Sequence, residues 1–181
     1  MDKVKILPFQ TEDTEDRMKA AGLLRQAFPE AYGMSAEEEV ENCLHEERIA
    51  LKAVWEGELV GFIGAIPQYG ETAWELHPLV VHEKHRGRGI GRALIIALEE
   101  VVASQGGITL YLGSDDESFA TSLGGTDLYE DTWEKIRTIV NHGHHPFSFY
   151  ERMGYKIVGV IPDANGYGKP DIWMAKRIRK E

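Results

Sequence analysis

Hydrophobic and polar residues follow two different periods along the chain, and the two periods predict different elements. Alternation with a period of two, or a short run of apolar and β-branched residues, is typical of a strand. The sequence predicts strands at residues 3–9, 49–55, 59–68, 72–82, 108–113, 155–161 and 172–178. Apolar residues three and four positions apart are typical of an amphipathic helix. The sequence predicts helices at residues 14–28, 35–45, 88–104, 126–140 and 146–153.

Proline, glycine and capping residues mark the ends of several elements. Pro8 cannot donate a ladder hydrogen bond, so it places the first strand at a sheet edge. Ser35 stands three residues before Glu38, which is a capping-box pattern at the start of a helix. Residues 56–58 predict a hairpin turn, and residues 28–33 are expected to form a loop between the first two helices.

The order of these elements predicts the fold class. Several antiparallel strands come first, and strand, helix, strand, helix and strand follow in turn. This order is typical of an α/β (α+β) fold with one central, mostly antiparallel mixed sheet and helices on both faces. A length of 181 residues fits a single domain that spans residues 1–181.

The charge balance excludes one large class of partners. The chain holds 30 Asp and Glu against 20 Lys and Arg, a formal net charge of −10. Neutralising phosphates takes a surplus of basic residues, so we expect no nucleic-acid partner, whereas a cationic small molecule is compatible with this charge. The stretch from Gly113 to Glu134 carries seven acids and neither Lys nor Arg, which predicts a solvated surface or a cation-attracting region.

The single cysteine and the hydropathy pattern argue against a disulfide-bonded, zinc-binding or membrane-spanning protein. Cys43 cannot form an internal disulfide or build a Cys-rich zinc site, so we expect a core residue with no covalent role in catalysis. No apolar run is long enough to span a membrane, and the N-terminus opens without the apolar region of a signal peptide. We therefore expect a cytoplasmic protein that has no membrane partner.

Three histidines in one short segment, His142, His144 and His145, resemble a metal-binding tract. They lack a carboxylate or cysteine partner at a ligand spacing, so the sequence favours a surface loop. We expect no metal.

Residues 83–92 form a basic, glycine-rich segment between a predicted strand and a long predicted helix. A helix N-terminus presents unpaired N–H groups and a partial positive charge, and glycines let an anion approach the backbone. The segment has neither the Gly-Lys-Ser/Thr of a Walker motif nor the Gly-x-Gly-x-x-Gly of a dinucleotide fold. It predicts an anion site, with ionic contacts from Arg86, Arg88 and Arg92.

The spacing Arg86-x-x-Gly89-x-Gly91 resembles the motif by which GNAT acetyltransferases bind the pyrophosphate of coenzyme A. From about Phe28 to Lys176 the chain also resembles a narrower group, the aminoglycoside 6'-N-acetyltransferases of the chromosomal enterococcal type. The segments that carry this closer resemblance are residues 61–70, 74–81, 111–116, 126–130, 149–160 and 170–176.

The resemblance implies the GNAT fold, acetyl-CoA as co-substrate, transfer to the 6'-amine of an aminoglycoside, a role in antibiotic resistance, and a homodimer. It also implies that Glu75 contacts the substrate amine, that His77 and Leu79 lie where a strand meets the thioester, and that Tyr150 is an acid for the departing thiolate. Residues 117–119 depart from the pattern, because Glu117-Ser118-Phe119 stands where family members carry further acids.

Strand geometry supports a site at residues 74–81, because successive side chains turn to opposite faces. One face carries Glu75, His77 and Leu79, and the other carries Trp74, Leu76 and Pro78. Pro78 removes a ladder donor in mid-strand, so we expect a bulge that splays two strands and lets pantetheine insert. The backbone N–H near Leu79 would polarise the acetyl carbonyl. Expected coenzyme A contacts are Leu79, Val80, Val81, Arg86, Gly87, Arg88, Gly89, Ile90, Gly91 and Arg92.

The acceptor amine arrives protonated and must lose a proton before it attacks. Glu75, His77 or a water is the candidate base, and Tyr150, on a short helix after Pro146, is the candidate acid. Open α/β sheets bind ligands at strand ends. The expected acceptor contacts are therefore Trp74, Glu75, Asp115, Asp116 and Glu117.

Two other functions stay open at the level of sequence. The acceptor of a GNAT enzyme could be a polyamine, a small basic protein or a peptide amine, or the chain could be a non-catalytic module that binds acetyl-CoA. The Arg86 motif and Tyr150 argue against loss of catalysis, but they do not select the acceptor.

Overall fold

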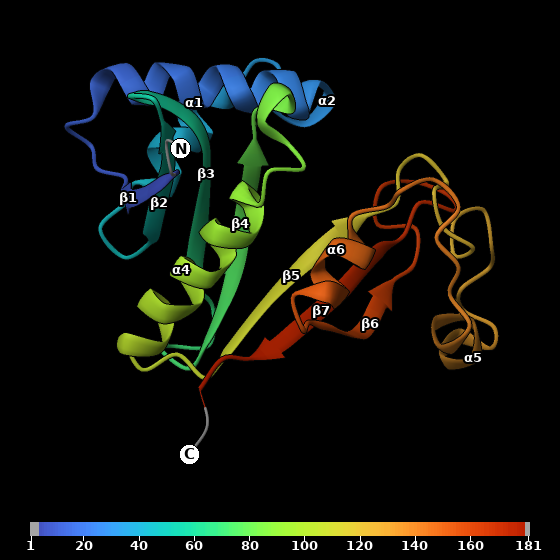
Figure 1. The fold of residues 1–181 in the computed structure, drawn as a ribbon. Coiled ribbons are helices and arrows are strands. Elements are labelled where there is room, and N and C mark those ends of the chain that lie inside the picture. The colour runs from blue at the N-terminus through green and yellow to red at the C-terminus, as the bar shows by residue number, and fades with distance from the viewer. Residues whose placement is uncertain (1–3, 180–181) are drawn as a thin grey trace. The chain divides into compact units, whose positions relative to one another are not determined.

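The computed structural model of the chain describes residues 4–179. It divides into two compact units, each held by its own internal contacts. The first unit contains the residues up to Leu110 together with the C-terminal residues from Ile178, and the second contains Tyr111–Arg177. Figure 1 labels the helices and strands of each unit.

The first unit is built on antiparallel strands in the order in which they occur along the chain. They are β1 (Lys5–Pro8), β2 (Ile49–Trp55), β3 (Glu58–Pro67) and β4 (Ala73–Val81). Strand β5 (Thr109–Asp115), the neighbour of β4 in the sheet, begins in this unit. The predicted strands are confirmed, and β1 lies at the sheet edge that Pro8 indicates. The turn between β2 and β3 uses positive φ angles at Glu56 and Gly57, as a tight hairpin requires.

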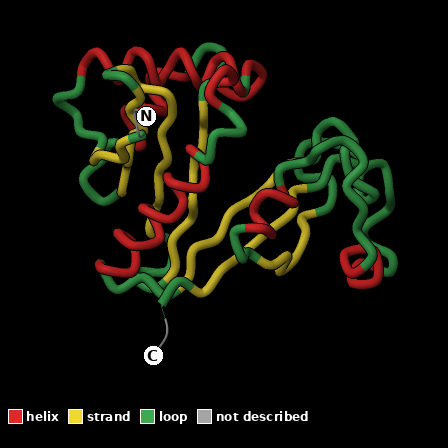
Figure 2. Tube along the Cα trace, viewed as in Figure 1, coloured by secondary structure: helices red, strands yellow, loops and turns green. Residues whose placement is uncertain are grey.

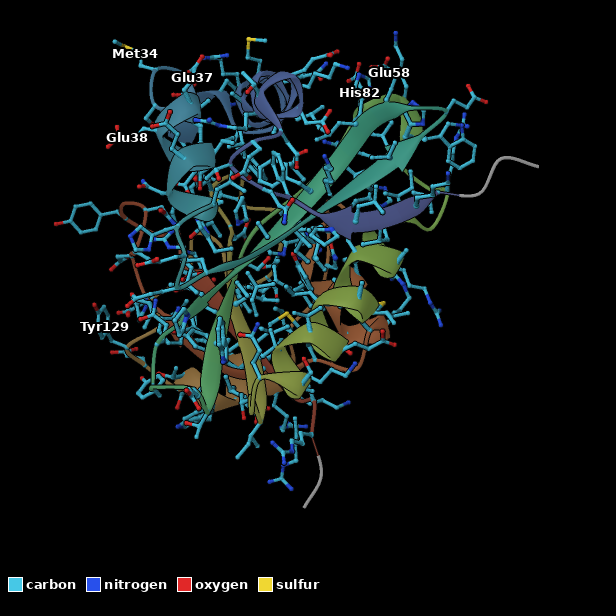
Figure 3. All side chains as sticks on the ribbon, turned by 90° about the vertical axis from the view of Figure 1, so that its left-hand side faces the viewer. Met34, Glu37, Glu38, Glu58, His82 and Tyr129 are labelled. Carbon is cyan, nitrogen blue, oxygen red and sulfur yellow. The ribbon has the colours of Figure 1, made fainter. Side chains whose placement is uncertain are left out.

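Helices cover both faces of these strands. Helices α1 (Thr14–Ala27), α2 (Pro29–Tyr32) and α3 (Ala36–Cys43) lie on one side and α4 (Ile90–Ser104) on the other, as Figures 1 and 3 show. A short 3-10 turn, η1 (Glu83–His85), joins β4 to the segment before α4. The core beneath α1 and α3 is apolar and includes Leu24, Val40, Phe62 and Val80. Burial of these side chains fixes α1 and α3 on the sheet.

Two local expectations for the first unit are wrong. Residues 28–33 are not a plain loop, because Pro29 begins the short helix α2; proline suits a first helical turn, where its missing N–H costs no hydrogen bond. Helix α3 begins after Ser35, but the Ser35 side chain makes no capping hydrogen bond, so the predicted capping box with Glu38 does not form.

The register between β3 and β4 shifts at Gly64, which stands opposite both His77 and Pro78. A Cβ atom on Gly64 would lie 2.5 Å from the carbonyl oxygen of His77, so the two strands can approach this closely only because residue 64 is glycine. This shift is the β-bulge that Pro78 predicts in mid-strand. Leu79 is the first β4 residue to resume regular pairing after it.

The second unit contains β5, β7 (Asp171–Arg177) and β6 (Lys156–Ile161), in that order across its sheet. Helix α6 (Phe147–Arg152) contacts β7. Figure 2 shows that loops make up much of this unit besides its strands. The predicted helix at residues 126–140 is wrong in extent, because α5 covers only Thr132–Arg137. Tyr129 and Trp133 are 73% and 70% exposed, so the segment lacks the buried apolar face that would hold a longer helix.

Candidate functional site

The loop before α4 has the backbone of an anion site. Gly87 and Gly89 have φ angles of +73° and +82°, a left-handed conformation that strains residues with a Cβ atom. Gly89 is the residue before the helix, and its carbonyl accepts the first helical hydrogen bond, from Ala93. The N–H groups of the first helical turn, at Ile90 and Gly91, therefore lie at the end of the helix where an anion is stabilised.

Basic side chains surround this backbone. Arg86, Arg88 and Arg92 are all exposed. The Nε of Arg86 donates to the carbonyl oxygen of Val81 at 3.1 Å, which fixes the loop to the end of β4 and leaves the terminal nitrogens of Arg86 for another partner. A small pocket lies beside it, lined by Leu23, Gln26, Ala27, Val81, His82, Glu83 and Arg86. A glycine-rich loop, exposed guanidinium groups and an adjacent pocket together give this end of β4 the features of an anion site.

The end of β4 presents its backbone more than its side chains. Leu79, Val80 and Val81 pair with β3 after the bulge. The side chain of Val80 is 2% exposed, and that of Ile90 is 1% exposed. Of the expected coenzyme contacts, these two residues can therefore offer only backbone atoms.

Glu75 lies on β4 before the bulge with its carboxylate held in place. The side-chain amide of Gln68 donates to Oε2 of Glu75 at 2.9 Å. The residue is only partly buried, so the carboxylate is fixed and still accessible to an acceptor amine. Gln68 was not predicted, since nothing in its own sequence context distinguishes it from a surface residue.

His77 lies two residues further along β4 and is held by two helices. Its Nε2 lies 3.1 Å from the hydroxyl oxygen of Tyr32 in α2 and 3.4 Å from Oε1 of Glu39 in α3. The hydrogen bond with His77 lowers the pKa of Glu39 and outweighs the effect of its burial. Sequence reasoning missed Tyr32 and Glu39, because their spacing along the chain does not show that they meet β4.

Burial and the same carboxylate together keep the Cys43 thiol protonated. The thiol is buried and donates to Oε1 of Glu39 at 3.6 Å. Burial, and then the negative charge of Glu39, raise the pKa of the Cys43 thiol far above its ordinary value. A thiol held in this way is a poor nucleophile. The prediction of a core cysteine is confirmed.

Trp74 requires a correction. It is only 4% exposed, and its indole N–H donates to the carbonyl oxygen of Glu71 at 2.9 Å. Its side chain packs in the sheet and offers no surface to an acceptor. We therefore reassign Trp74 from the expected acceptor contacts to the core of the first unit.

In the second unit, Tyr150 lies on α6 among other aromatic rings. Its ring centroid is 5.2 Å from that of Phe149 and 5.8 Å from that of Tyr155, both in edge-to-face contact. Burial raises the pKa of the Tyr150 phenol well above its ordinary value. A tyrosine phenol is protonated throughout the neutral range in any case, and the raised pKa keeps the proton on Tyr150 and makes the phenol a weaker acid.

The three acids of the second unit that are expected to contact the acceptor lie in different environments. Asp116 is fully buried and accepts hydrogen bonds from the backbone N–H groups of Ala120 and Thr121 and from the Thr121 hydroxyl, at 2.7 to 2.9 Å. It shapes its loop and cannot reach a ligand, so its assignment as an acceptor contact is corrected. Asp115 and Glu117 are exposed. Asp115 accepts from the Asn165 amide at 2.5 Å and still presents its carboxylate at the surface.

The three histidines of the suspected metal tract also separate. His142 and His144 are exposed, as a surface loop predicts. His145 is 4% exposed, and its Nε2 lies 2.9 Å from the carbonyl oxygen of Asp115, so it supports the end of β5 and does not belong to a surface loop. Within residues 4–179, no group of three His, Cys, Asp or Glu residues could hold a metal ion.

None of the helices in the same range combines the length and hydropathy needed to cross a bilayer.

Comparison with known proteins gives one family and a group of similar solved structures. Residues 18–130 match the model of the acetyltransferase (GNAT) family. The chain is similar to an aminoglycoside 6'-N-acetyltransferase complexed with coenzyme A, with 54% identity over 98% of each chain and a TM-score of 0.96. An aminoglycoside 6'-N-acetyltransferase from Enterococcus faecium matches with 54% identity over 98% of each chain and a TM-score of 0.93.

A third solved structure, an aminoglycoside 6'-acetyltransferase type Ii, matches with 48% identity and a TM-score of 0.79 over 98% of this chain and 99% of that chain. No curated protein sequence matches the chain.

Proposed function

Because the chain belongs to the acetyltransferase (GNAT) family, we propose that it transfers the acetyl group of acetyl-CoA to the 6'-amine of aminoglycoside antibiotics. One observation carries this proposal. The chain is 54% identical, over 98% of its length, to an aminoglycoside 6'-N-acetyltransferase that binds coenzyme A, and the two folds agree with a TM-score of 0.96. The enzyme is a transferase, and its co-substrate is acetyl-CoA.

The donor side of the proposed site consists of β4 and the loop before α4. The N–H groups of residues 87–92 and the guanidinium groups of Arg86, Arg88 and Arg92 would hold the pyrophosphate. The backbone of residues 79–81 would hold the pantetheine arm, and the N–H of Leu79 is the proposed donor to the thioester carbonyl, where negative charge develops. Acetyl-CoA supplies an acetyl group already activated as a thioester.

On the acceptor side, Glu75 and His77 on β4 are the proposed contacts of the first unit. In the second unit, the exposed acids Asp115 and Glu117 keep their assignment as proposed acceptor contacts. The Glu75 carboxylate, held by Gln68, would bind the protonated amine of the drug. Glu75, His77 or a water then takes the proton, and the neutral amine attacks the acetyl carbon directly in a ternary complex. A net charge of −10 attracts a polycationic acceptor at long range.

Tyr150 is the proposed donor of the proton that the departing thiolate takes up, and the second proton that the nitrogen loses as the amide forms restores the phenol. Its phenol is protonated at neutral pH, as tyrosines ordinarily are, and burial raises its pKa further. No protein thiol takes part, since the pKa of the buried Cys43 is raised as well.

Four further features belong to this proposal. We propose one catalytic domain, because the matched family model runs from residue 18 to residue 130 and so includes parts of both compact units. The protein would act in the cytoplasm, where acetyl-CoA is present, and would form a homodimer. Acetylation of the drug would give antibiotic resistance.

Two matched aminoglycosides test the site of transfer. One carries an amine at the 6' position, and the other carries a hydroxyl there. The proposal predicts thiol release from acetyl-CoA and a singly acetylated product with the first compound only. Equal turnover of both would place the reacting amine elsewhere on the drug and refute 6' transfer.

A further inference from the structure

Three rings outside the proposed chemistry lie beside the glycine-rich loop. They are Trp55 at the end of β2, His82 just after β4, and His85 at the end of η1. The ring centroids of Trp55 and His85 are 6.1 Å apart, and those of His85 and His82 are 5.7 Å apart with the planes nearly perpendicular. We call Trp55, His82 and His85 the ring cluster.

The guanidinium group of Arg88 lies over the indole of Trp55, with 5.7 Å from its Cζ to the ring centroid. Arg88 stands between two glycines, Gly87 and Gly89, both with positive φ. A Cβ atom at either glycine would meet nothing within 4 Å, so no other segment packs against the Cβ side of these two residues. Among these contacts, the one with the indole face of Trp55 restrains the exposed side chain of Arg88.

The ring cluster is attached to the sheet of the first unit by hydrogen bonds and strand pairing. Trp55 is the last residue of β2 in an antiparallel hairpin. The backbone N–H of His82 donates to the carbonyl oxygen of Val60 at 2.8 Å, and the Nε of Arg86 donates to that of Val81 at 3.1 Å. Trp55 and the turn that carries His85 are thus both anchored to β3 and β4, and Arg88 is held against a fixed support.

We propose that Trp55 is a positioning residue for coenzyme binding, which acts by holding the Arg88 guanidinium ready for a phosphate group of coenzyme A. The inference rests on the proposed function, because it takes the loop to be the coenzyme site. A planar guanidinium can stack on an aromatic face and keep its N–H groups directed outward to an anion. Trp55 itself needs no contact with the coenzyme.

The physical advantage is a smaller loss of conformational freedom on binding. A long, exposed arginine side chain between two glycines loses both side-chain and backbone freedom when it takes a phosphate. A side chain that already rests on the Trp55 ring has lost part of that freedom before the ligand arrives, and pre-organisation of this kind raises affinity.

A titration of coenzyme A into the full chain, followed by calorimetry, tests this role. Trp55→Leu keeps an apolar side chain but removes the aromatic face, and Trp55→Phe keeps an aromatic face. We expect Trp55→Leu to raise the Kd for coenzyme A about two- to fivefold, the size of an exposed cation–π contact, while Trp55→Phe stays near the wild type. KM for acetyl-CoA should follow Kd, and kcat should not change.

The dependence on Arg88 separates positioning from direct contact. In an Arg88→Ala background, Trp55→Leu should weaken binding no further, because the two residues then act as one unit. Additive losses would mean that Trp55 touches the coenzyme itself, for example by stacking on its adenine, and would overturn the proposal. Trp133→Ala, which removes an exposed tryptophan from the second unit, is the matched control and should leave Kd unchanged.

The remaining outcomes distinguish this inference from the proposed function. If the wild-type chain binds coenzyme A and Trp55→Leu binds it equally well, the role of Trp55 is wrong and the proposed function stands. If the wild-type chain does not bind coenzyme A, the proposed function fails, and the role of Trp55 fails with it.

Discussion

Oε1 of Glu39 lies 3.4 Å from Nε2 of His77, so this contact joins helix α3 to strand β4. His77 belongs to the proposed acceptor side of the site. The Tyr32 hydroxyl lies 3.1 Å from the same nitrogen. The imidazole is therefore held from α2 and α3 together. Its orientation depends on helices that precede β4 in the chain, since Tyr32 lies 45 residues before His77.

Removal of Glu39 should impair the acceptor side selectively. Glu39→Ala takes away the carboxylate that orients His77, and a lost charge-assisted hydrogen bond in a half-buried place corresponds to a fall in kcat/KM for the acceptor of about tenfold. The Kd for coenzyme A should not change. Steady-state kinetics with the acceptor varied, together with a coenzyme titration, measure both quantities.

Glu38→Ala is the matched control for Glu39. Glu38 is the preceding residue of the same helix, is exposed, and points away from the strands in Figure 3. The two variants lose the same charge. An equal fall in kcat/KM for both would show that charge, and not the contact with His77, is responsible.

Glu75 should matter for the acceptor and not for the coenzyme. Glu75→Ala removes the carboxylate proposed to bind the protonated amine, and the loss of a hydrogen bond between charged groups should lower kcat/KM for the acceptor about ten- to a hundredfold. Glu71→Ala removes an exposed acid from the preceding turn and should have little effect. A large rise in the Kd for coenzyme A in Glu75→Ala would contradict the role assigned to Glu75.

Tyr150→Phe should lower kcat without unfolding the protein. General acids contribute about 10²- to 10⁴-fold to a rate, so we expect kcat to fall by about a hundredfold. Because burial raises the pKa of Tyr150, kcat in the wild type should show no decline at mildly alkaline pH that is due to this residue. Tyr129→Phe, which changes an exposed phenol, is the control; equal kcat values for Tyr150→Phe and the wild type would remove Tyr150 from the mechanism.

Lys52 should stabilise the fold through two aspartates. Its Nζ lies 2.9 Å from Asp13 and 2.6 Å from Asp16, and the Lys52 residue is 7% exposed. Burial opposes its charge, but the hydrogen bonds to Asp16 and Asp13 outweigh burial and raise the pKa of Lys52. Lys52→Met leaves both carboxylates without their cation, and should lower the free energy of unfolding by about 1–3 kcal/mol at pH 7.

The same ion pair predicts a pH dependence. Hydrogen bonds from Lys52 and from the backbone of Gln10 lower the pKa of Asp13. A lowered pKa in the folded state stabilises the protein above the ordinary value of about 3.9, and this stabilisation is lost as the pH falls through the folded-state pKa. Urea unfolding should therefore show the gap between wild type and Lys52→Met closing below about pH 4. A gap that is constant with pH, or an equal effect of Lys19→Met at an exposed pair, would contradict this origin.

Most of the first unit can be predicted from the sequence, because its hydrophobic periodicity and the glycine and proline residues at the ends of its elements indicate the same boundaries. The hairpin at Glu56–Gly57, the bulge at Pro78 and the glycine-rich start of α4 each have a local backbone conformation that few other residue types would favour. The predicted family is confirmed for the same reason. A pattern of this kind is local, so it can be read without knowledge of the tertiary structure.

Contacts between distant segments could not be predicted in this way. Tyr32 and His77 lie 45 residues apart, and the contact of Arg88 with Trp55 depends on how β2 ends beside the loop. Burial decided the two corrected assignments, because Trp74 and Asp116 have side chains suited to a ligand but direct them to backbone groups of their own unit. The residue type shows what a side chain could bind, and only the fold shows whether a ligand can reach it.

The acceptor is the central claim, and a direct comparison of acceptors tests it. Thiol release from acetyl-CoA would be followed with a kanamycin-type aminoglycoside, a polyamine and a basic peptide under the same conditions. We predict that kcat/KM for the aminoglycoside exceeds that of the other two acceptors by a wide margin. If the polyamine or the peptide turns over while the aminoglycoside does not exceed background, the chain is a GNAT enzyme with a different acceptor, and the proposed function is wrong.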